Sequence, residues 1–474
     1  MALTKTIVMK FGGTTVGDAF AFKRVVEIIQ SHAVSPRIVV VSAMSGVTDA
    51  LLTSAEMANR GETGAAIDNL NEHFERHLRV ARGLDEKEYR ELETLIDRTR
   101  REIADKLTQP LCDSMRPIFQ NMIAAFGEYL SANLLTALLR ASGVPASYVD
   151  ARSCIITDEE PNCASPLLEE TEQHTRATLV PILKAGDVPV LGGFIGATLK
   201  GTTTTLGRGG SDYTAALVGA AIRAREIQIW TDVDGVLTAD PRVVESAYTV
   251  AQLSYAEASE LAYFGAKVLH PKTIQPATKY DIPLRICNSR TPDAFGTLVS
   301  AEPETTSRTL KAIAHKTGVT TVKVTSGRFV GAYGFLRRIF EIFDRYRTVV
   351  DVVSTSEVSL SLSLDDISAL PSILRELQQI GSVEFKTHRA VVCVVGEGLS
   401  GAPRITAAVF DSIKNIPVSL ISQGVSSSNL TFVVDQEHVK WVVTRLHERF
   451  FESRKESVQE ATSLELHSVA ESSF

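Results

Sequence analysis

The sequence predicts an α/β protein with a mainly parallel sheet, followed by two smaller α/β domains. The chain opens with a strand, a glycine turn and a helix over residues 5–30. Further buried strands end in glycine-rich or hydroxyl-rich loops, as in open parallel sheets. Near the C-terminus, residues 350–356 and 418–424 repeat one pattern, an apolar strand entering a polar turn after an amphipathic helix. These three observations together predict the class.

The opening unit carries the first candidate site. Thr6–Val8 predicts a buried strand, Gly12 and Gly13 a tight turn, and the apolar spacing of Ala19–Gln30 a helix. Lys10 stands at the carboxyl end of the strand, where glycine N–H groups and a helix N-terminus bind phosphate. A short glycine motif also fits an ordinary turn with a solvated lysine, so the later motifs must decide between the two interpretations.

Length and composition indicate a soluble globular protein of two or three domains. The chain has 474 residues, of which 44% are hydrophobic and 22% charged. Its formal net charge of −7 disfavours a nucleic-acid or anionic-membrane surface. The five cysteines are scattered without metal-ligand spacing, so we expect reduced thiols and no metal site. We find no signal-peptide core and no uninterrupted apolar stretch that spans a bilayer, and we expect a cytoplasmic protein.

The next elements supply two more candidate residues. Residues 37–42 predict a second buried strand, and Thr48 in the loop after it is either a ligand contact or a helix N-cap. Residues of about 61–115 predict a helical excursion without chemistry. Residues 124–140 predict a mostly apolar helix with one carboxylate, Glu128. A buried carboxylate is costly unless it is paired, so Glu128 is either functional or part of a structural salt bridge.

A glycine-rich loop after the third predicted strand is the strongest local signal. Residues 189–194 predict a strand, and a threonine run leads to residues 206–213, Leu-Gly-Arg-Gly-Gly-Ser-Asp-Tyr. Backbone N–H groups, the fork of Arg208 and the hydroxyl of Ser211 form a typical anion cradle at the start of a helix over residues 214–223. A merely flexible loop does not explain the embedded arginine and aspartate.

A second polar loop follows the next predicted strand. Residues 226–232 predict a strand, and the loop after it combines acids for a metal or ribose with Arg242 for phosphate. A helix over residues 255–272 breaks at Gly265, and we interpret His270 as structural. Residues 283–288 predict a closing strand. The domain boundaries that we expect are 1–297 for the catalytic domain, 298–312 for a linker, 313–390 and 391–452 for the two repeats, and 453–474 for a disordered tail.

Five motifs in a fixed order resemble one family. KFGGTTV, FGEYLSA, GRGGSDYTAA, WTDVDGVLTADPR and FGAKVLHPKT occur as in aspartokinases, and the C-terminal repeat is similar to their tandem ACT domains. The resemblance covers nearly the whole chain except the tail, and is greatest to the lysine-sensitive monofunctional branch. It implies an amino-acid-kinase-like three-layer sandwich followed by two ferredoxin-like ACT domains. It also implies ATP-dependent phosphorylation of the aspartate β-carboxylate, the first step of lysine, threonine and methionine biosynthesis.

The resemblance also implies residue roles. The catalytic pair is Lys10 and Asp212. Aspartate is held by Thr48, Glu128, Arg208, Gly209, Gly210 and Ser211. ATP, with its Mg²⁺, is held by Lys10, Phe11, Gly12, Gly13, Thr231, Asp232, Leu237, Arg242 and Lys267. The allosteric effector, lysine in the first place, is held by Gly334, Leu336, Val350, Asp351, Thr355, Ser356 and Glu357. Leu237 stands where an aromatic residue is frequent, which puts ring stacking on the nucleotide in doubt.

The partners that follow are aspartate, Mg-ATP, an amino-acid effector and a second copy of the chain. We expect a homodimer through the ACT domains, with a dimer of dimers as a further possibility, and no nucleic acid or membrane. Two rival functions stay open: another enzyme of the same kinase fold, acting on glutamate derivatives, carbamate or UMP, and a catalytically silent amino-acid sensor. The chain has no G-x-x-x-x-G-K-[ST] motif, so a P-loop enzyme is excluded.

Overall fold

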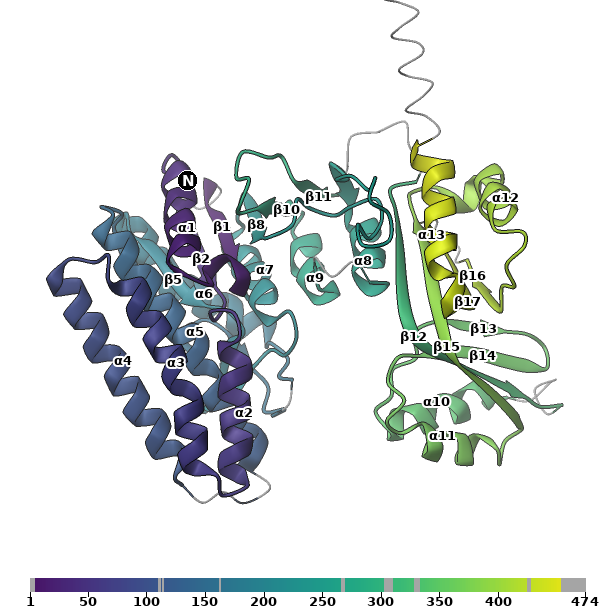
Figure 1. The fold of residues 1–474 in the computed structure, drawn as a ribbon, viewed down its shortest axis with the longest axis horizontal. Coiled ribbons are helices and arrows are strands. Elements are labelled where there is room, and N and C mark those ends of the chain that lie inside the picture. The colour runs from purple at the N-terminus through teal and green to yellow at the C-terminus, as the bar shows by residue number, and fades with distance from the viewer. Residues whose placement is uncertain are drawn as a thin grey trace, which may run out of the picture. The chain divides into compact units, whose positions relative to one another are not determined.

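The computed structural model describes residues 5–109, 112, 115–161, 163–265, 269–301, 310–327, 333–423 and 428–452. The chain forms two compact units, drawn in Figure 1. The first unit comprises Met1–Val236, Ala251–Ala258 and Val268–Glu304. The second comprises Leu237–Val250, Ser259–Lys267 and Thr305–Phe474. The predicted tail 453–474 and Lys267 lie outside the described residues.

A mainly parallel sheet forms the centre of the first unit, which confirms the predicted class. Its strand order is β3-β5-β2-β1-β8-β10-β11-β9, and only the pair β10–β11 is antiparallel. The strands are β1 (Ile7–Phe11), β2 (Arg37–Val41), β3 (Ala146–Val149), β5 (Val188–Gly192), β8 (Glu226–Thr231), β9 (Gln252–Ser254), β10 (Leu284–Asn288) and β11 (Thr297–Ser300). A smaller sheet joins β4 (Ile156–Thr157), β6 (Ile195–Thr198) and β7 (Thr203–Thr205).

The central strands read as continuous apolar runs because helices cover both faces of a parallel sheet. Every residue of β1 is buried, and β1 lies between β2 and β8. Phe11 pairs with Val41 on one side and Trp230 on the other. The carboxyl ends of three strands therefore meet at one edge, which is where open α/β sheets bind ligands.

The helices of this unit are α1 (Ala19–Ser31), α2 (Val47–Asn59), α3 (Thr63–Ala81), α4 (Glu86–Leu107), α5 (Arg116–Ala141), α6 (Leu168–Ala185), α7 (Gly210–Ile222) and α9 (Pro271–Lys279). The sequence analysis did not predict α6. Helix α8 (Tyr255–Tyr263) begins in this unit, and its residues from Ser259 onwards belong to the second. The pair α3 and α4 is the predicted helical excursion. The apolar stripe of α4, with Leu92 and Ile96, is buried in the same core as β1. His270 caps α9 by accepting a bond from the Lys272 N–H, which agrees with the structural role expected for it.

Helix α5 is a core helix. In the described part of the chain it is the one helix long and apolar enough to span a bilayer, but 72% of its apolar window is buried inside the protein. Burial on all sides explains why its sequence lacks the one-sided apolar stripe of a surface helix. It is this helix that carries Glu128.

The second unit contains one six-stranded sheet of order β13-β14-β12-β15-β17-β16. Its strands are β12 (Ala312–Thr325), β13 (Val353–Thr355), β14 (Ser359–Leu364), β15 (Ser382–Val395), β16 (Leu420–Ser422) and β17 (Asn429–Asp435). Its helices are α10 (Phe335–Arg345), α11 (Leu370–Leu377), α12 (Pro403–Ser412) and α13 (Val439–His447).

The two repeats share their longest strands. Residues 320–325 of β12 pair with β14 and with the first half of β15. Residues 312–317 of β12 pair with residues 390–395, the half of β15 that also pairs with β17. The expected boundary at residue 390 thus falls inside β15, and part of the expected linker, residues 298–300, lies in β11. Because both repeats use β12 and β15, these two strands are not left as the open edges that two separate small sheets would have.

Candidate active site

The catalytic pair predicted from the sequence is in direct contact. Lys10 is the penultimate residue of β1, and Asp212 lies in the first turn of α7. Their Nζ and Oδ1 atoms are 2.5 Å apart, and the two side chains are 11% and 15% exposed. Gly209 caps α7 with φ 72°, a left-handed conformation that favours glycine. The Lys10 ammonium is therefore held at the N-terminal, positive end of α7. An incoming anion there would meet both the ammonium and the helix dipole.

Glu128 faces the same space as a buried carboxyl group. The residue is 4% exposed, and its Oε2 is buried without a hydrogen-bond partner among the described residues. Burial raises the pKa of Glu128 to about 8, although the Ala43 backbone N–H and Lys10 act in the opposite direction. The site thus contains a carboxyl oxygen, Oε2 of Glu128, that can accept a hydrogen bond from a ligand or pair with a cation.

Two glycines at the end of β5 let α5 and α7 approach the sheet. A Cβ on Gly192 would lie 2.8 Å from the Cβ of Glu128. A Cβ on Gly193 would lie 2.6 Å from the Cα of Ser211. Both glycines therefore set how close the carboxylate and the glycine-rich loop come to the strand ends.

A cavity of about 200 Å³ opens between these groups. Its lining is Lys10, Ser42, Thr48, Glu128, Phe194, Gly207, Gly209, Gly210, Ser211 and Asp212. It includes the predicted catalytic pair and five of the six residues predicted to hold aspartate, the exception being Arg208. Arg208 is exposed, one residue before the lining Gly209.

Three residues of the lining are missing from the prediction. Ser42 follows β2, which ends at Val41, whereas the sequence analysis placed Ser42 inside the second strand. Gly207 belongs to the predicted cradle but not to the predicted site. Phe194 has φ 66°, a left-handed conformation that no local sequence signal indicated.

The predicted nucleotide residues divide between the two units. Phe11, Gly12 and Gly13 end β1 and enter a short 3₁₀ helix, and Thr231 and Asp232 end β8 beside them. The Gly12 N–H donates to the Trp230 carbonyl at 3.2 Å. This bond occupies a donor that the prediction assigned to phosphate, because strand pairing with β8 continues one residue past β1.

Leu237 and Arg242 lie in the second unit. Arg242 forms an ion pair of 2.6 Å with Asp240, and its guanidinium holds the pKa of Asp240 below the ordinary value. The Arg242 side chain is 80% exposed. The arginine is thus pre-oriented by a local carboxylate and remains open to a ligand, while Lys267 lies outside the described residues.

Known proteins of the same architecture match this chain over almost its full length. The Amino acid kinase family matches residues 5–288, and an ACT domain family matches residues 392–450. The Lysine-sensitive aspartokinase 3 of Escherichia coli (strain K12) is 36% identical over 461 residues, which cover 95% of this chain and 100% of that protein. The chain belongs to the aspartokinases. Aspartokinase 2, chloroplastic, of Arabidopsis thaliana is also 36% identical, over 94% of this chain and 85% of that protein.

Two solved aspartokinase structures agree with the fold. The crystal structure of E. coli aspartokinase III in complex with aspartate and ADP (R-state) has a TM-score of 0.82 at 35% sequence identity. The complex of the same enzyme with lysine and aspartate (T-state) has a TM-score of 0.78 at 35% identity. Each comparison covers 94% of this chain and 100% of the other.

In this aspartokinase two of the expected effector residues, Asp351 and Thr355, lie beside opposite ends of β14. Thr355 pairs with Leu360, near the end of β12 from which the chain continues towards α10. The Asp351 N–H donates to the Ser363 carbonyl. Thr355 follows Asp351 by four positions, roughly 13 Å of extended chain. One copy of the chain therefore does not gather these residues into a single cluster.

The other expected effector residues divide between those two ends. Gly334 caps α10 with φ 74°, and Leu336 in its first turn is 44% exposed. Ser356 contacts Ser359 in the β13–β14 turn, and Glu357 is exposed. Val350 packs beside the core of the first repeat, next to Asp351.

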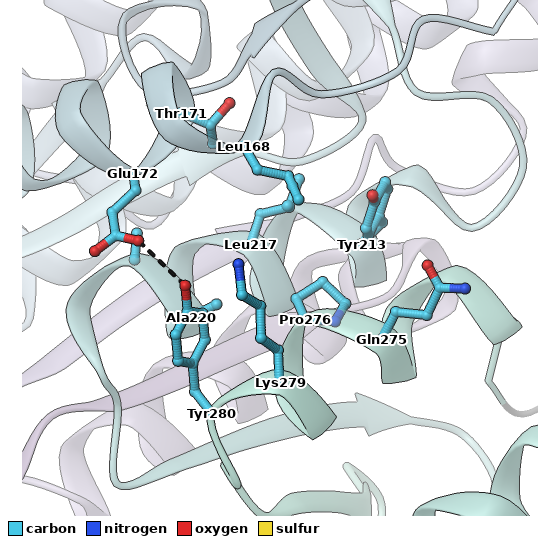
Figure 2. A pocket seen from close by; sticks show the side chains of 11 residues that line it. Leu168, Thr171, Glu172, Tyr213, Leu217, Ala220, Gln275, Pro276, Lys279 and Tyr280 are labelled. Carbon is cyan, nitrogen blue, oxygen red and sulfur yellow. Dashed lines mark hydrogen bonds between the residues drawn. The ribbon is translucent and has the colours of Figure 1, made fainter.

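A second cavity of about 180 Å³ lies between α6, α7 and α9 (Figure 2). No predicted site residue lines it. Tyr280 donates to Glu172 over 3.4 Å, as Figure 2 shows, and Arg223 forms an ion pair with the same carboxylate at 2.9 Å. Because Glu172 already has these two partners, this cavity does not offer the free acceptor that the Glu128 cavity offers.

Proposed function

We propose that the first unit transfers the γ-phosphoryl group of ATP to the β-carboxylate of L-aspartate. The observation that carries the proposal is the single cavity in which Lys10, Asp212 and Glu128 meet the N-terminus of α7. An oxygen of the substrate carboxylate forms a bond to γ-phosphorus while the bond to the β,γ-bridging oxygen breaks. The products are 4-phospho-L-aspartate and ADP. No covalent intermediate with the enzyme is needed, because the carboxylate is already an anionic nucleophile.

The chain supplies positioning and charge rather than covalent chemistry. Lys10 neutralises the transferring phosphoryl group, whose negative charge would otherwise repel the attacking carboxylate. Asp212, 2.5 Å from the ammonium, keeps Lys10 pointed at the reacting atoms. The N–H groups at the start of α7 add partial positive charge on the same side.

Glu128 and Arg208 would hold opposite ends of the amino acid. Anionic Glu128 would accept from the α-ammonium through Oε2, the oxygen for which the described part of the chain supplies no partner. Arg208 is exposed and does not line the cavity, so its side chain would have to turn towards the cavity to pair with a carboxylate. Thr48 and Ser211 add hydroxyls from the cavity wall.

The nucleotide would lie at the carboxyl ends of β1 and β8. Thr231 and Asp232 are placed for the ribose or for water around Mg²⁺, which binds together with ATP. We extend the site to Leu237, Arg242 and Lys267 on the strength of the family motif. ADP occupies the related E. coli enzyme together with aspartate, which supports a nucleotide and an amino acid bound side by side.

The test is an aspartyl-hydroxamate assay with purified protein, aspartate and Mg-ATP. Hydroxylamine traps the acyl phosphate, so colour requires a phosphorylated carboxylate. Aspartate-dependent colour with no response to glutamate derivatives, carbamate or UMP supports the proposal. A response to one of those substrates in place of aspartate would favour another enzyme of the same fold, and no turnover with any of them would favour a silent sensor.

We also propose that lysine inhibits the enzyme through the first ACT repeat, at an interface between two copies. The observations that favour it are the covered acid Asp351, and its separation from Thr355 within one chain, which a second copy could bridge. The short strands β13 and β16 are the two edges of the sheet, where copies could pair. Lysine bound to the related E. coli enzyme supports this effector. Such feedback suits a cytoplasmic enzyme that begins a branched amino-acid pathway.

Inhibition assays with lysine, threonine and methionine test the regulatory proposal. Asp351→Ala and Thr355→Ile should lose lysine inhibition and keep catalysis. Threonine inhibition, or lysine inhibition that survives both changes, would contradict the choice of effector or of repeat. Sedimentation of the full chain with and without lysine tests the homodimer and a dimer of dimers.

A further inference from the structure

His447 is a fully buried histidine that the proposed reaction does not use. It is the last residue of α13, in the second repeat. Its Nε2 lies 2.9 Å from the hydroxyl oxygen of Thr238, and its Nδ1 lies 2.9 Å from a carboxylate oxygen of Glu452. An ionised carboxylate only accepts hydrogen bonds, so in the neutral ring Nδ1 carries the proton and Nε2 accepts from the Thr238 hydroxyl. The ring therefore links the end of α13 to residue 238.

Thr238 belongs to a loop that the sequence assigns to the kinase and the fold assigns to the second unit. Residues 237–250 lie within the range 5–288 that the amino acid kinase family matches, yet they pack in the second unit. The Thr238 N–H donates to the Tyr248 carbonyl at 2.9 Å, and the Thr238 carbonyl accepts from the Ile313 N–H at 2.8 Å. The Thr238 hydroxyl also accepts from the Tyr248 N–H at 3.1 Å. Residue 238 is thus fixed to β12 by its backbone and to α13 by its side chain.

Apolar residues on both sides of Arg242 bury the same loop in the core of the second repeat. Ala239 and Val244 are buried in one hydrophobic core with residues of β15, β17 and α13. Between them, the Asp240 carbonyl accepts from the Val244 N–H at 2.9 Å and closes a turn. The position of Arg242 therefore depends on packing against the second repeat.

The end of the second repeat makes a further contact with the loop through Glu452. The Ser246 hydroxyl donates to Oε1 of Glu452, the same oxygen that lies beside the His447 ring. The Tyr248 ring meets His447 edge-on, with ring centroids 6.4 Å apart, and Phe451 stacks on the other side at 5.0 Å. Polar and aromatic contacts of His447 thus converge on this one loop.

We propose that His447 is a positioning residue for the nucleotide, because it fixes the loop 237–250 that carries Arg242. The inference rests on the proposed function, in which Arg242 binds ATP. Ordering a loop when a ligand binds costs free energy, and a loop that is already held avoids that cost. The second ACT repeat would then support nucleotide binding directly, through a contact that lies outside the first repeat.

His447→Phe keeps a ring stacked on Phe451 and removes both nitrogen contacts. The buried Thr238 hydroxyl then loses its acceptor, and the loop is held less firmly. We expect the KM for ATP to rise about threefold or more, with kcat and the KM for aspartate nearly unchanged. In His447→Gln the amide oxygen reaches the place of Nε2 and can accept from Thr238. This variant should keep the KM for ATP within about twofold of the wild-type value.

Thr238→Val tests the other side of the same bond, and Thr431→Val is its matched control. Thr431 is also buried, on β17, and its hydroxyl donates to the Cys393 Sγ at 3.3 Å, so both variants exchange a buried hydroxyl for a methyl group. We expect the KM for ATP to rise in Thr238→Val and to stay at the wild-type value in the control. Combining Thr238→Val with His447→Phe should add little to the larger single effect, because both changes break one bond.

A role limited to stability would lower the melting temperature without separating the two substrates. An unchanged KM for ATP in both His447→Phe and Thr238→Val, or an equal rise for ATP and aspartate, would overturn the proposal. So would a rise of the same size in the Thr431→Val control. If His447→Phe does not fold, Thr238→Val decides the question alone, since valine has nearly the shape of threonine.

Arg242→Ala separates this proposal from the function on which it rests, once the hydroxamate assay has shown that the wild type phosphorylates aspartate. If Arg242→Ala leaves the KM for ATP unchanged, the loop does not hold the nucleotide, and the role of His447 fails with that of Arg242. If Arg242→Ala raises the KM for ATP while His447→Phe and Thr238→Val do not, only the positioning role is wrong.

Discussion

The Glu128 carboxyl group is buried, and one of its oxygens has no hydrogen-bond partner among the described residues; burial gives the site a dependence on pH. Burial raises its pKa to about 8, so near pH 7 most of the free protein carries a neutral carboxyl group there. A substrate ammonium needs the anion. Binding aspartate is therefore linked to loss of a proton from Glu128.

We expect kcat/KM for aspartate to rise with pH between 6.5 and 9, because this ratio reports ionisations of the free enzyme, about tenfold per unit well below the pKa. The same ratio for ATP should lack that rise. Glu128→Gln should weaken aspartate, spare ATP and flatten the aspartate profile. A wild-type profile without a rise near pH 8, or a Gln variant that retains it, would contradict the assignment.

The same shift predicts an effect on stability. A carboxyl group with a raised folded-state pKa binds more protons when folded, so its contribution falls as pH rises from the unfolded value of 4.5 through about 8. Glu128→Gln should therefore raise the melting temperature more at pH 8.5 than at pH 6, measured by calorimetry without ligands. Equal changes at both pH values would show that Glu128 is already charged in the free protein.

Lys10 should act on turnover more than on binding. In the proposed reaction its ammonium lies at the transferring phosphoryl group, so Lys10→Ala should lower kcat at least about a hundredfold, roughly 2.7 kcal/mol, with little change in the KM for aspartate. Lys23→Ala is the control, because Lys23 is exposed on α1 and forms a long ion pair with Glu27, at 4.0 Å. A Lys10 variant with near-normal turnover would exclude the catalytic role.

At the scale of elements, close packing between α5, β5 and α7 sets the width of the cavity. The Cβ of Gly193→Ala would lie 2.6 Å from the Ser211 Cα, and neither backbone can move without shifting the loop that holds Asp212. We expect the free energy of unfolding in urea to fall by about 1–3 kcal/mol and aspartate affinity to fall with it.

Gly64→Ala is the control for that substitution. Gly64 lies in the first turn of α3, and a Cβ there meets nothing within 4 Å. The change should be neutral or slightly stabilising, since alanine favours helix over glycine by up to about 1 kcal/mol. Equal loss of stability in both variants would mean that the close approach at Gly193 is not what limits packing.

At the scale of the whole molecule, the shared strands make the two repeats one folding unit. A fragment of residues 310–390 retains the first half of β12 but loses its partner, residues 391–395 of β15. A fragment of residues 310–452 retains both. We expect the longer fragment to melt in one cooperative transition by circular dichroism and the shorter one to be largely unfolded. Two separate transitions, or a stable shorter fragment, would show that the repeats fold independently.

Much of the kinase site could be predicted because its residues follow local rules. A strand that ends in glycines, a cradle of glycines that opens a helix, and a carboxylate on an apolar helix are each visible within about ten residues. Parallel strands then bring such ends to one edge of a sheet. This is why Lys10, Thr48, Glu128 and the loop 209–212 line one cavity.

By itself, then, the sequence determined the class of fold, the order of its elements and the chemistry at the end of each strand. Only the tertiary structure decided which donors remain available: the Gly12 N–H is taken by Trp230, and Arg208 lies outside the cavity. It also decided that β12 and β15 serve both repeats and that Tyr263 covers Asp351. Local patterns depend on neighbours along the chain, whereas these contacts depend on strand register and on loops that bring together residues up to 218 positions apart, as between Gly12 and Trp230.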